Sequence, residues 1–291
     1  MILILADSLR NDFATKYLKG IFPEESWSSF RSVETLTPIV LASIATGKPP
    51  SETGVQYFTD VVNEEACDNI LFDNFDSYVT ISRLLGAGPG IVPPARRQNI
   101  YMLKPIKWNA ESNHDDDVLQ YIGKKWSLAT DYWVDFIFYH SWLTHGPWGI
   151  DNYGPAELPC VMNTDRLMRR NSLEDNKKWY KLGIDDFAIR LREIREITNN
   201  QETIIITADH GEDLGEGGGK GHYAGAELEE LRTVPIWINR DVEIPEDINH
   251  LNLKDFVVDM YNRFEKENEE YQKYKMRCQD LPTKFKVTVG E

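Results

Sequence analysis

The sequence predicts an α/β protein with a mostly parallel central sheet that is flanked by helices on both faces. Short apolar runs rich in β-branched residues alternate along the chain with stretches of helical periodicity, which is typical of a parallel sheet with crossover helices. The 291 residues, 41% hydrophobic and 11% aromatic, are enough for one large core and differ from the composition of a disordered chain. Two of the apolar runs end in an aspartate, where open α/β sheets bind their ligands.

The elements are predicted in chain order. Ile2–Ala6 is an uninterrupted apolar run and predicts the first buried strand. A helix is expected over Ile39–Ala45, because the fixed φ of Pro38 suits a first helical turn. The later expected elements are a strand at Trp133–Tyr139, a long helix near Tyr180–Ile197, and strands at Thr203–Thr207 and Val234–Ile238. Apolar residues recur at helical spacing in the long helix, which predicts core packing: Ile184, Phe187, Leu191 and Ile194.

One domain is predicted over residues 1–291, because no repeat, low-complexity tract or clear linker interrupts the chain. A polar, irregular insertion is expected around residues 150–178. A charged amphipathic helix around residues 255–276 is expected to serve packing or contact in a homo-oligomer.

Charge and cysteine usage limit the classes of partner. A net charge of −15 argues against binding to nucleic acid or to an anionic membrane, since both would repel the protein. No window approaches eighteen consecutive apolar residues, so no membrane span is predicted. The three cysteines are widely spaced and odd in number, which favours reduced thiols and a cytoplasmic location.

The segment that begins at Thr207 and reads Thr-Ala-Asp-His-Gly-Glu-Asp-Leu-Gly-Glu is the most informative part of the chain. It places Asp209 and His210 at the end of a predicted strand. A carboxylate beside an imidazole suits zinc, manganese or iron better than magnesium or calcium. The glycines that follow allow tight turns, so His222 can fold back toward the same site. The alternative interpretation is a surface loop without chemistry.

Two further polar residues lie at the edges of predicted elements. Asp7 ends the first strand as Asp209 ends a later one, so both carboxylates can reach one cation, although Asp7 can instead cap a turn. Thr37 precedes the predicted helix at Pro38. Its hydroxyl can cap that helix, or it can act as a nucleophile beside a bound cation.

These motifs together resemble the alkaline phosphatase superfamily, in its sulfatase-like and phosphodiesterase branches. The resemblance covers roughly residues 1–262 in the right order. The matching elements are Asp7-Ser-Leu-Arg, Thr37 with Thr46-Gly47, His140 with His145-Gly-Pro-Trp, the Asp209-His210 segment, Lys220-Gly-His222 and Arg232-Thr-Val-Pro. The resemblance implies a three-layer alkaline phosphatase-like core without a large C-terminal subdomain.

The resemblance also implies roles for single residues. Asp7, Asp209 and His210 would hold one divalent cation, with Thr37 as both ligand and nucleophile. His222 would belong to a second metal position or bind the anionic oxygens of the substrate. His145 would face the substrate or a metal, with support from His140, and Lys220 would contact the transferred group. We expect His145 and His222 to line one cleft on the side away from Asp7.

Departures from the family pattern refine the predicted activity. The usual sulfatases carry Cys or Ser for oxidation to formylglycine, and Thr37 cannot undergo that oxidation. Pro38 stands one place earlier than in the family pattern, so Thr35 is an alternative nucleophile, although the spacing to Thr46-Gly47 favours Thr37. Leu143 and Thr144 stand where the family has an acidic residue, so the site could bind either one or two cations. We predict a zinc- or manganese-dependent hydrolase of a small anionic phosphate ester, a mono- or diester, through Thr37.

Two alternatives to this prediction remain. One is a sulfatase-like hydrolase or a phosphoryl-group transferase that uses the same site. The other is a degenerate member of the superfamily that binds an anion or a partner protein without catalysis.

Overall fold

The computed structural model describes residues 1–57, 60–81, 100–102, 119, 122, 134–146, 171–269 and 272–273. In this part of the chain, seven strands form one sheet in the order β2-β7-β6-β1-β5-β3-β4. The strands are β1 (Ile2–Ala6), β2 (Ser26–Arg31), β3 (Tyr78–Ile81), β4 (Ile100–Met102), β5 (Phe136–Ser141), β6 (Ile204–Ala208) and β7 (Thr233–Ile238).

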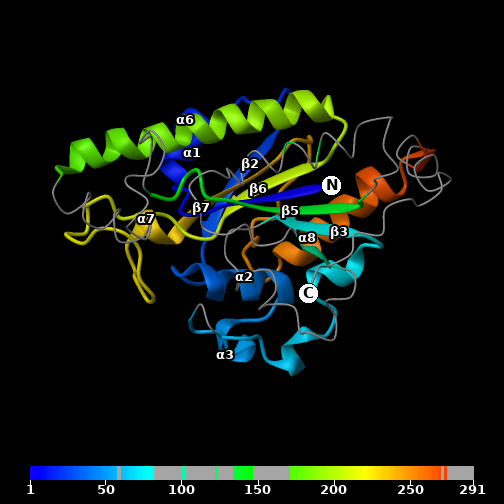
Figure 1. Cartoon of the computed structure of the whole chain (residues 1–291), viewed down its shortest axis with the longest axis horizontal. Coiled ribbons are helices and arrows are strands. Elements are labelled where there is room, and N and C mark those ends of the chain that lie inside the picture. The colour runs from blue at the N-terminus through cyan, green and yellow to red at the C-terminus, as the bar shows by residue number, and fades with distance from the viewer. Residues whose placement is uncertain are drawn as a thin grey trace.

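Helices cover both faces of the sheet and complete a three-layer architecture, as predicted (Figure 1). The helices α1 and α6 lie over one face, and α2, α3 and α8 lie over the other (Figure 1). The α-helices are α1 (Asn11–Tyr17), α2 (Thr37–Thr46), α3 (Pro50–Thr53), α6 (Leu173–Thr198), α7 (Glu229–Arg232) and α8 (Leu253–Tyr261). Short 3-10 turns span Glu64–Cys67 and Leu71–Asn74, and a π-helical turn spans Asn262–Lys266.

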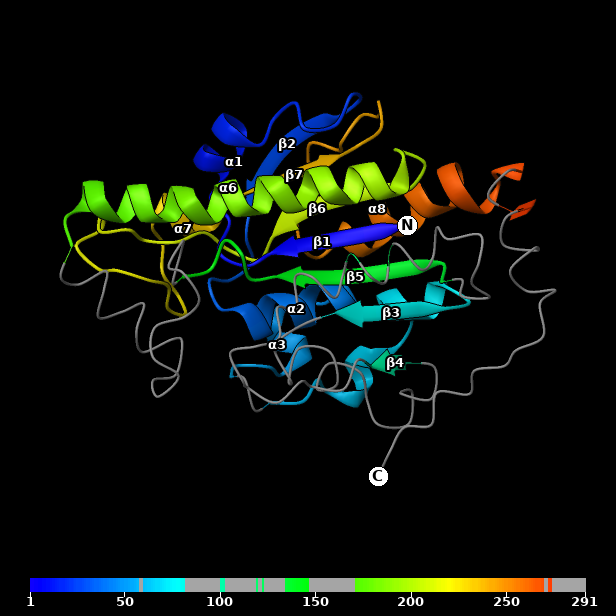
Figure 2. The same ribbon diagram turned by 45° about the horizontal axis from the view of Figure 1, so that its top comes forward.

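The central strand β1 pairs in parallel with both β5 and β6, and the three lie side by side in the sheet (Figure 2). Every residue of β1 is completely buried, because helices cover both faces of a parallel sheet and its strands read as continuous apolar runs. The parallel pairs β3–β5 and β3–β4 extend the sheet on one side. The predicted mostly parallel sheet is therefore confirmed.

The other side of the sheet differs from a purely parallel one. β7 runs antiparallel to β6, and β2 runs antiparallel to β7. The polar run Ser26–Arg31 forms the edge strand β2, which the sequence analysis did not predict. Its side chains are mostly half-exposed, so it lacks the apolar signal of a central strand.

The long helix α6 starts seven residues before the predicted Tyr180 and ends at Thr198. The Ser172 hydroxyl accepts a hydrogen bond from the backbone N–H of Asp175 at the N-terminus, and Asn199 in the left-handed conformation ends the helix. The predicted apolar stripe is buried: Ile184, Phe187, Leu191 and Ile194. α6 overlaps the polar insertion predicted over residues 150–178 from Leu173 on, and residues 150–170 lie outside the described part.

At the C-terminal end, α8 and the π-helical turn confirm helical structure in the first half of the predicted helix at residues 255–276. Residues 274–276 lie outside the described part of the chain. None of the described helices combines the length and the apolar character that a membrane span requires.

Candidate active site

The two strand-end carboxylates lie at the same edge of the sheet. Ala6 of β1 is in register with Ala208 of β6, so Asp7 and Asp209 follow neighbouring strands at their carboxyl ends. On the other side of β1, His140 of β5 is in register with Leu5. One ligand atom from each of Asp7, His140 and Asp209 lies within 4.8 Å of the other two. The predicted convergence of Asp7 and Asp209 is confirmed.

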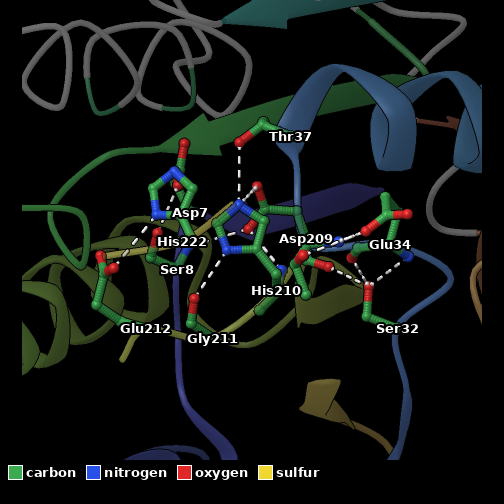
Figure 3. Close-up of polar contacts among 12 residues, drawn as sticks. Asp7, Ser8, Ser32, Glu34, Thr37, Asp209, His210, Gly211, Glu212 and His222 are labelled. Carbon is green, nitrogen blue, oxygen red and sulfur yellow. Dashed lines mark hydrogen bonds and ion pairs between the residues drawn. The ribbon is translucent and has the colours of Figure 1, made fainter. Parts of the chain in front are cut away.

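Thr37 and His210 extend this group. The Oγ1 atom of Thr37 lies 3.2 Å from Nε2 of His210, which in turn lies 3.2 Å from Oδ2 of Asp209 (Figure 3). Thr37 is the first residue of α2, and Leu36 occupies the N-cap position. The interpretation of Thr37 as the N-cap is therefore wrong, because its side chain turns toward His210 and makes no cap hydrogen bond.

Thr35, the alternative nucleophile, makes different contacts. Its hydroxyl donates to the carbonyl oxygen of Tyr223 and also lies 3.2 Å from the carboxylate of Glu34. The hydroxyl of Thr37 is thus the one that contacts the predicted metal ligand His210.

His222 returns to the site as predicted. The glycine-rich segment folds back on itself through paired backbone hydrogen bonds between Asp213 and Gly221, of 3.1 and 2.8 Å. The ring of His222 consequently packs against the ring of His210, with centroids 4.3 Å apart, and against that of His145, with centroids 5.3 Å apart.

The adjacent rings of His145 and His222 agree with the prediction that the two histidines line one cleft. The position of this cleft relative to Asp7 stays a prediction.

Two of the residues that line the site, His140 and Glu212, have positions that the sequence did not predict. His140, expected to support His145, instead places Nε2 at 3.2 Å from Oδ2 of Asp7. Glu212 is almost completely buried and contacts Nδ1 of His222 at 3.2 Å (Figure 3). A signal for Glu212 existed, since it follows His210 by two residues in the most informative segment.

Buried charges set the protonation of the site. Burial alone would raise the pKa of Asp7, but neighbouring imidazoles, above all that of His145, hold it well below its usual range. Burial lowers the pKa of His210 against the opposing charge of Asp209, so its imidazole is neutral near pH 7. His222 behaves oppositely, because the carboxylate of Glu212 outweighs burial and raises the pKa of His222 to about 9.

The donor set fits a divalent cation. A backbone carbonyl can only accept, so Nδ1 of His210, at 2.8 Å from the oxygen of Gly211, carries the proton. This tautomer leaves a lone pair on Nε2, as metal-binding histidines require. Oδ2 of Asp209 is buried and accepts no hydrogen bond from the described residues. Carboxylate, imidazole and hydroxyl donors together suit zinc or manganese.

Gly211, directly after His210, lies against the backbone of a second segment. A Cβ atom at residue 211 would lie 1.8 Å from the carbonyl oxygen of Glu230, so only glycine fits. The N–H of Gly211 also donates to the carbonyl oxygen of Leu231 at 2.9 Å. This close approach of two backbone segments holds the residues that flank Gly211, which are His210 and Glu212.

Solved structures share this architecture. The C-terminal periplasmic domain of phosphoethanolamine transferase EptC from Campylobacter jejuni aligns with 90% of this chain and 88% of its own, with a TM-score of 0.60 and 17% identity. A 2-O GAG sulfatase aligns with 90% of this chain and 70% of its own, with a TM-score of 0.61 and 13% identity. Phosphonate monoester hydrolase from Silicibacter pomeroyi aligns with 89% and 72%, with a TM-score of 0.58 and 13% identity. The chain has the fold of the alkaline phosphatase superfamily.

The sequence itself matches no protein-family model, and no curated protein matches it either. At 12–17% identity the structural neighbours establish the alkaline phosphatase-like fold, and the residues of the site must carry any argument about chemistry.

Lys220 was predicted to contact the transferred group. The structure places its ammonium group 2.8 Å from the carbonyl oxygen of Asn171, just before α6. Its role at the substrate stays a prediction, as do the assignments of His145 to the substrate and of His222 to a second metal position.

Another buried histidine, His250, contacts the strand end that precedes Asp209. Nε2 of His250 lies 2.8 Å from the carbonyl oxygen of Ala208, the residue before Asp209, and therefore donates to it. The hydroxyl of Ser32 lies 3.3 Å from Nδ1 of His250 and donates at 2.7 Å to the carbonyl oxygen of Asp209 (Figure 3). His250 thus holds the end of β6, which carries two of the predicted metal ligands.

The burial of His250 predicts an acid-sensitive contribution to stability. Burial lowers the pKa of His250 from 6.5 to about 3. Between these pH values the unfolded chain therefore binds a proton at His250 that the folded protein does not bind. Its contribution is therefore complete above pH 6.5 and is lost as the pH falls from 6.5 toward 3. Between pH 7 and pH 5 the loss amounts to about 2 kcal/mol.

The variant His250→Gln keeps an amide donor for Ala208 but cannot ionise. Urea unfolding of both proteins at the two pH values should show that the stability advantage of the wild type shrinks by about 2 kcal/mol at pH 5. Parallel pH profiles for the two proteins would contradict the neutral, buried state of His250.

Proposed function

We propose that this protein is a divalent-cation-dependent hydrolase of a phosphate ester and that Thr37 is its nucleophile. The observation that carries the proposal is the meeting of Asp7, Asp209, His210 and the Thr37 hydroxyl at one edge of the sheet. A surface loop without chemistry would not bury two carboxylates and a neutral imidazole around a hydroxyl, since buried charges are costly unless they are paired or bind a cation.

Asp7, Asp209 and His210 would hold the cation, with the Thr37 oxygen beside it. A bound zinc or manganese ion would polarise the phosphoryl group and lower the pKa of the Thr37 hydroxyl, which is too weak a nucleophile at neutral pH by itself. His140 lies close enough to Asp7 to be a further ligand or to hold that carboxylate in place.

His222 and Glu212 would serve the proton transfers of the reaction. Thr37 Oγ1 forms a bond to phosphorus as its proton leaves to solvent, and the bond from phosphorus to the leaving alcohol breaks. His222, protonated near pH 7 because its pKa is about 9, donates a proton to the departing oxygen through Nε2, since Glu212 holds Nδ1. Water then attacks phosphorus and breaks its bond to the Thr37 oxygen, which takes a proton back from solvent, and the neutral His222 takes up the proton that this water releases.

The test is a panel of chromogenic esters, namely a phosphate monoester, a phosphodiester and a sulfate ester, assayed with added zinc or manganese after removal of bound metal. We expect hydrolysis of a phosphate ester that a chelator abolishes and the metal restores. If the metal-loaded protein hydrolyses none of the three esters, the alternative of an anion-binding protein without catalysis replaces this proposal.

Group transfer is the second candidate, and one finding favours it. The domain of a phosphoethanolamine transferase aligns with most of this chain, and 88% of that domain is covered. A transferase would use the same Thr37 intermediate but pass the group to an alcohol acceptor. Added alcohols would then raise the rate of release of the chromogenic alcohol and yield a new ester, whereas a hydrolase would give free phosphate.

A further inference from the structure

Ser8, directly after Asp7, has an unusual backbone conformation. Its φ is +62°, in the left-handed region that residues other than glycine rarely adopt. Such strain persists only where surrounding contacts hold it, and it is concentrated at functional sites. Ser8 is completely buried at the carboxyl end of β1, next to the proposed cation site.

Each polar group of Ser8 contacts a different part of the site. Its backbone N–H donates to Oδ1 of Asp209 at 3.0 Å, and its hydroxyl donates to Oδ1 of Asp7 at 2.9 Å (Figure 3). Its carbonyl oxygen accepts a hydrogen bond of 2.7 Å from the hydroxyl of Tyr180 in α6. One residue therefore touches both carboxylates and the helix that covers this face of the sheet.

The two oxygens of each carboxylate have different partners. Both Oδ1 atoms are held by Ser8, while both Oδ2 atoms face imidazoles. Oδ2 of Asp7 lies 3.2 Å from Nε2 of His140, and Oδ2 of Asp209 lies 3.2 Å from Nε2 of His210. Ser8 thus contacts one oxygen of each carboxylate, and the other oxygen of each lies beside an imidazole nitrogen.

Tyr180 fixes the turn that makes this possible. Its hydroxyl accepts a hydrogen bond of 2.8 Å from the backbone N–H of Arg10 while it donates to Ser8, so it bridges both sides of the turn. The Tyr180 side chain is completely buried. Burial raises its pKa well above 10, so the phenol keeps its proton and remains a donor.

We propose that Ser8 and Tyr180 are positioning residues that orient the carboxylates of Asp7 and Asp209 for a divalent cation. This inference rests on the proposed function, because it assigns these hydrogen bonds to cation binding rather than to folding alone. Partners of this kind, which hydrogen-bond to metal ligands, typically contribute 10- to 100-fold to metal affinity.

The test compares variants of the metal-free full chain. Ser8→Ala removes the hydroxyl, Ser8→Gly removes it and also suits the positive φ, and Tyr180→Phe removes the bridge. Ser29→Ala and Tyr57→Phe are matched controls, because each removes a hydroxyl from an exposed residue. Calorimetric titration with manganese or zinc gives the affinity, and thermal unfolding without metal gives the stability.

Both Ser8 variants should bind the cation about 10- to 100-fold more weakly than the wild type, and Tyr180→Phe about 10-fold more weakly. The Tm of metal-free Ser8→Gly should be no lower than that of Ser8→Ala, because both lack the hydroxyl and glycine accepts the positive φ that strains alanine. Activity of both Ser8 variants should recover as the concentration of the cation is raised. The controls should match the wild type.

Two outcomes overturn the inference, and they are distinguishable. If the wild type binds the cation and both Ser8 variants bind it equally tightly, Ser8 serves the fold alone, and the proposed function is untouched. If the wild type binds neither manganese nor zinc, both the inference and the proposed function fail.

Discussion

Replacing Thr37 with valine should abolish turnover and leave the protein folded. Valine has nearly the shape of threonine, so the first turn of α2 and the buried packing around it should persist. The variant lacks only the hydroxyl that contacts His210 at 3.2 Å. If that oxygen is the nucleophile, the rate on a phosphate ester should fall by about 10³-fold or more.

Two further variants test whether the hydroxyl of Thr37 itself is responsible for this loss of activity. Thr37→Ser restores a hydroxyl at the same position and should recover part of the activity. Thr35→Ala removes a hydroxyl whose partners are Tyr223 and Glu34, so its effect should be milder. If metal-loaded Thr37→Val hydrolyses the ester as fast as the wild type, the covalent mechanism is wrong.

The second large effect is expected for Asp209→Asn. Asn can still accept, through its amide oxygen, the two backbone hydrogen bonds that Oδ1 receives from Ser8 and His210. Its neutral NH2 group would then occupy the position of Oδ2 and could not bind a cation. Cation affinity and metal-dependent activity should each fall by about 10²-fold or more.

The stability of Asp209→Asn should move in the opposite direction from its activity. Without the cation, the wild type keeps two buried carboxylates at one edge of the sheet, and the substitution removes one of these charges. Thermal unfolding of the metal-free proteins should therefore show a Tm for the variant equal to or above that of the wild type. A large fall in Tm would mean that Asp209 serves folding rather than cation binding.

Asp213→Asn is the matched control for this experiment. Asp213 is as buried as Asp209 and lies in the same segment, but its Oδ1 atom accepts hydrogen bonds from Gly215 and Gly217. This variant should bind the cation as the wild type does. Equal losses of affinity in both variants would show that the segment as a whole, and not Asp209 itself, determines binding.

The central strands and the helix α2 could be predicted because local pattern and burial agree there. Ile2–Ala6 is apolar throughout since β1 is covered on both faces, and its predicted bounds are those observed. The antiparallel pairing of β7 could not be predicted, because an apolar run does not indicate the direction of its neighbour. β2 has no apolar run at all, since it lies at the edge of the sheet.

In the site, too, some positions could be predicted from the sequence and others could not. Asp7 and Asp209 were predictable because residues that directly follow parallel strands gather at one edge. The contact of His140 with Asp7 depends on the register that pairs Leu5 with His140 across two strands, which the sequence of β5 alone does not contain. The strained turn at Ser8 depends on Tyr180, which lies 172 residues further along the chain.

The most direct test of the account is a crystal structure of the protein grown with manganese, with the ion located by its anomalous scattering. We expect a cation bonded to carboxylate oxygens of Asp7 and Asp209 and to Nε2 of His210, with Oγ1 of Thr37 beside it. Bond lengths should be about 2.0–2.3 Å. A cation bound elsewhere, or no cation in this group at a concentration that supports turnover, would contradict the account.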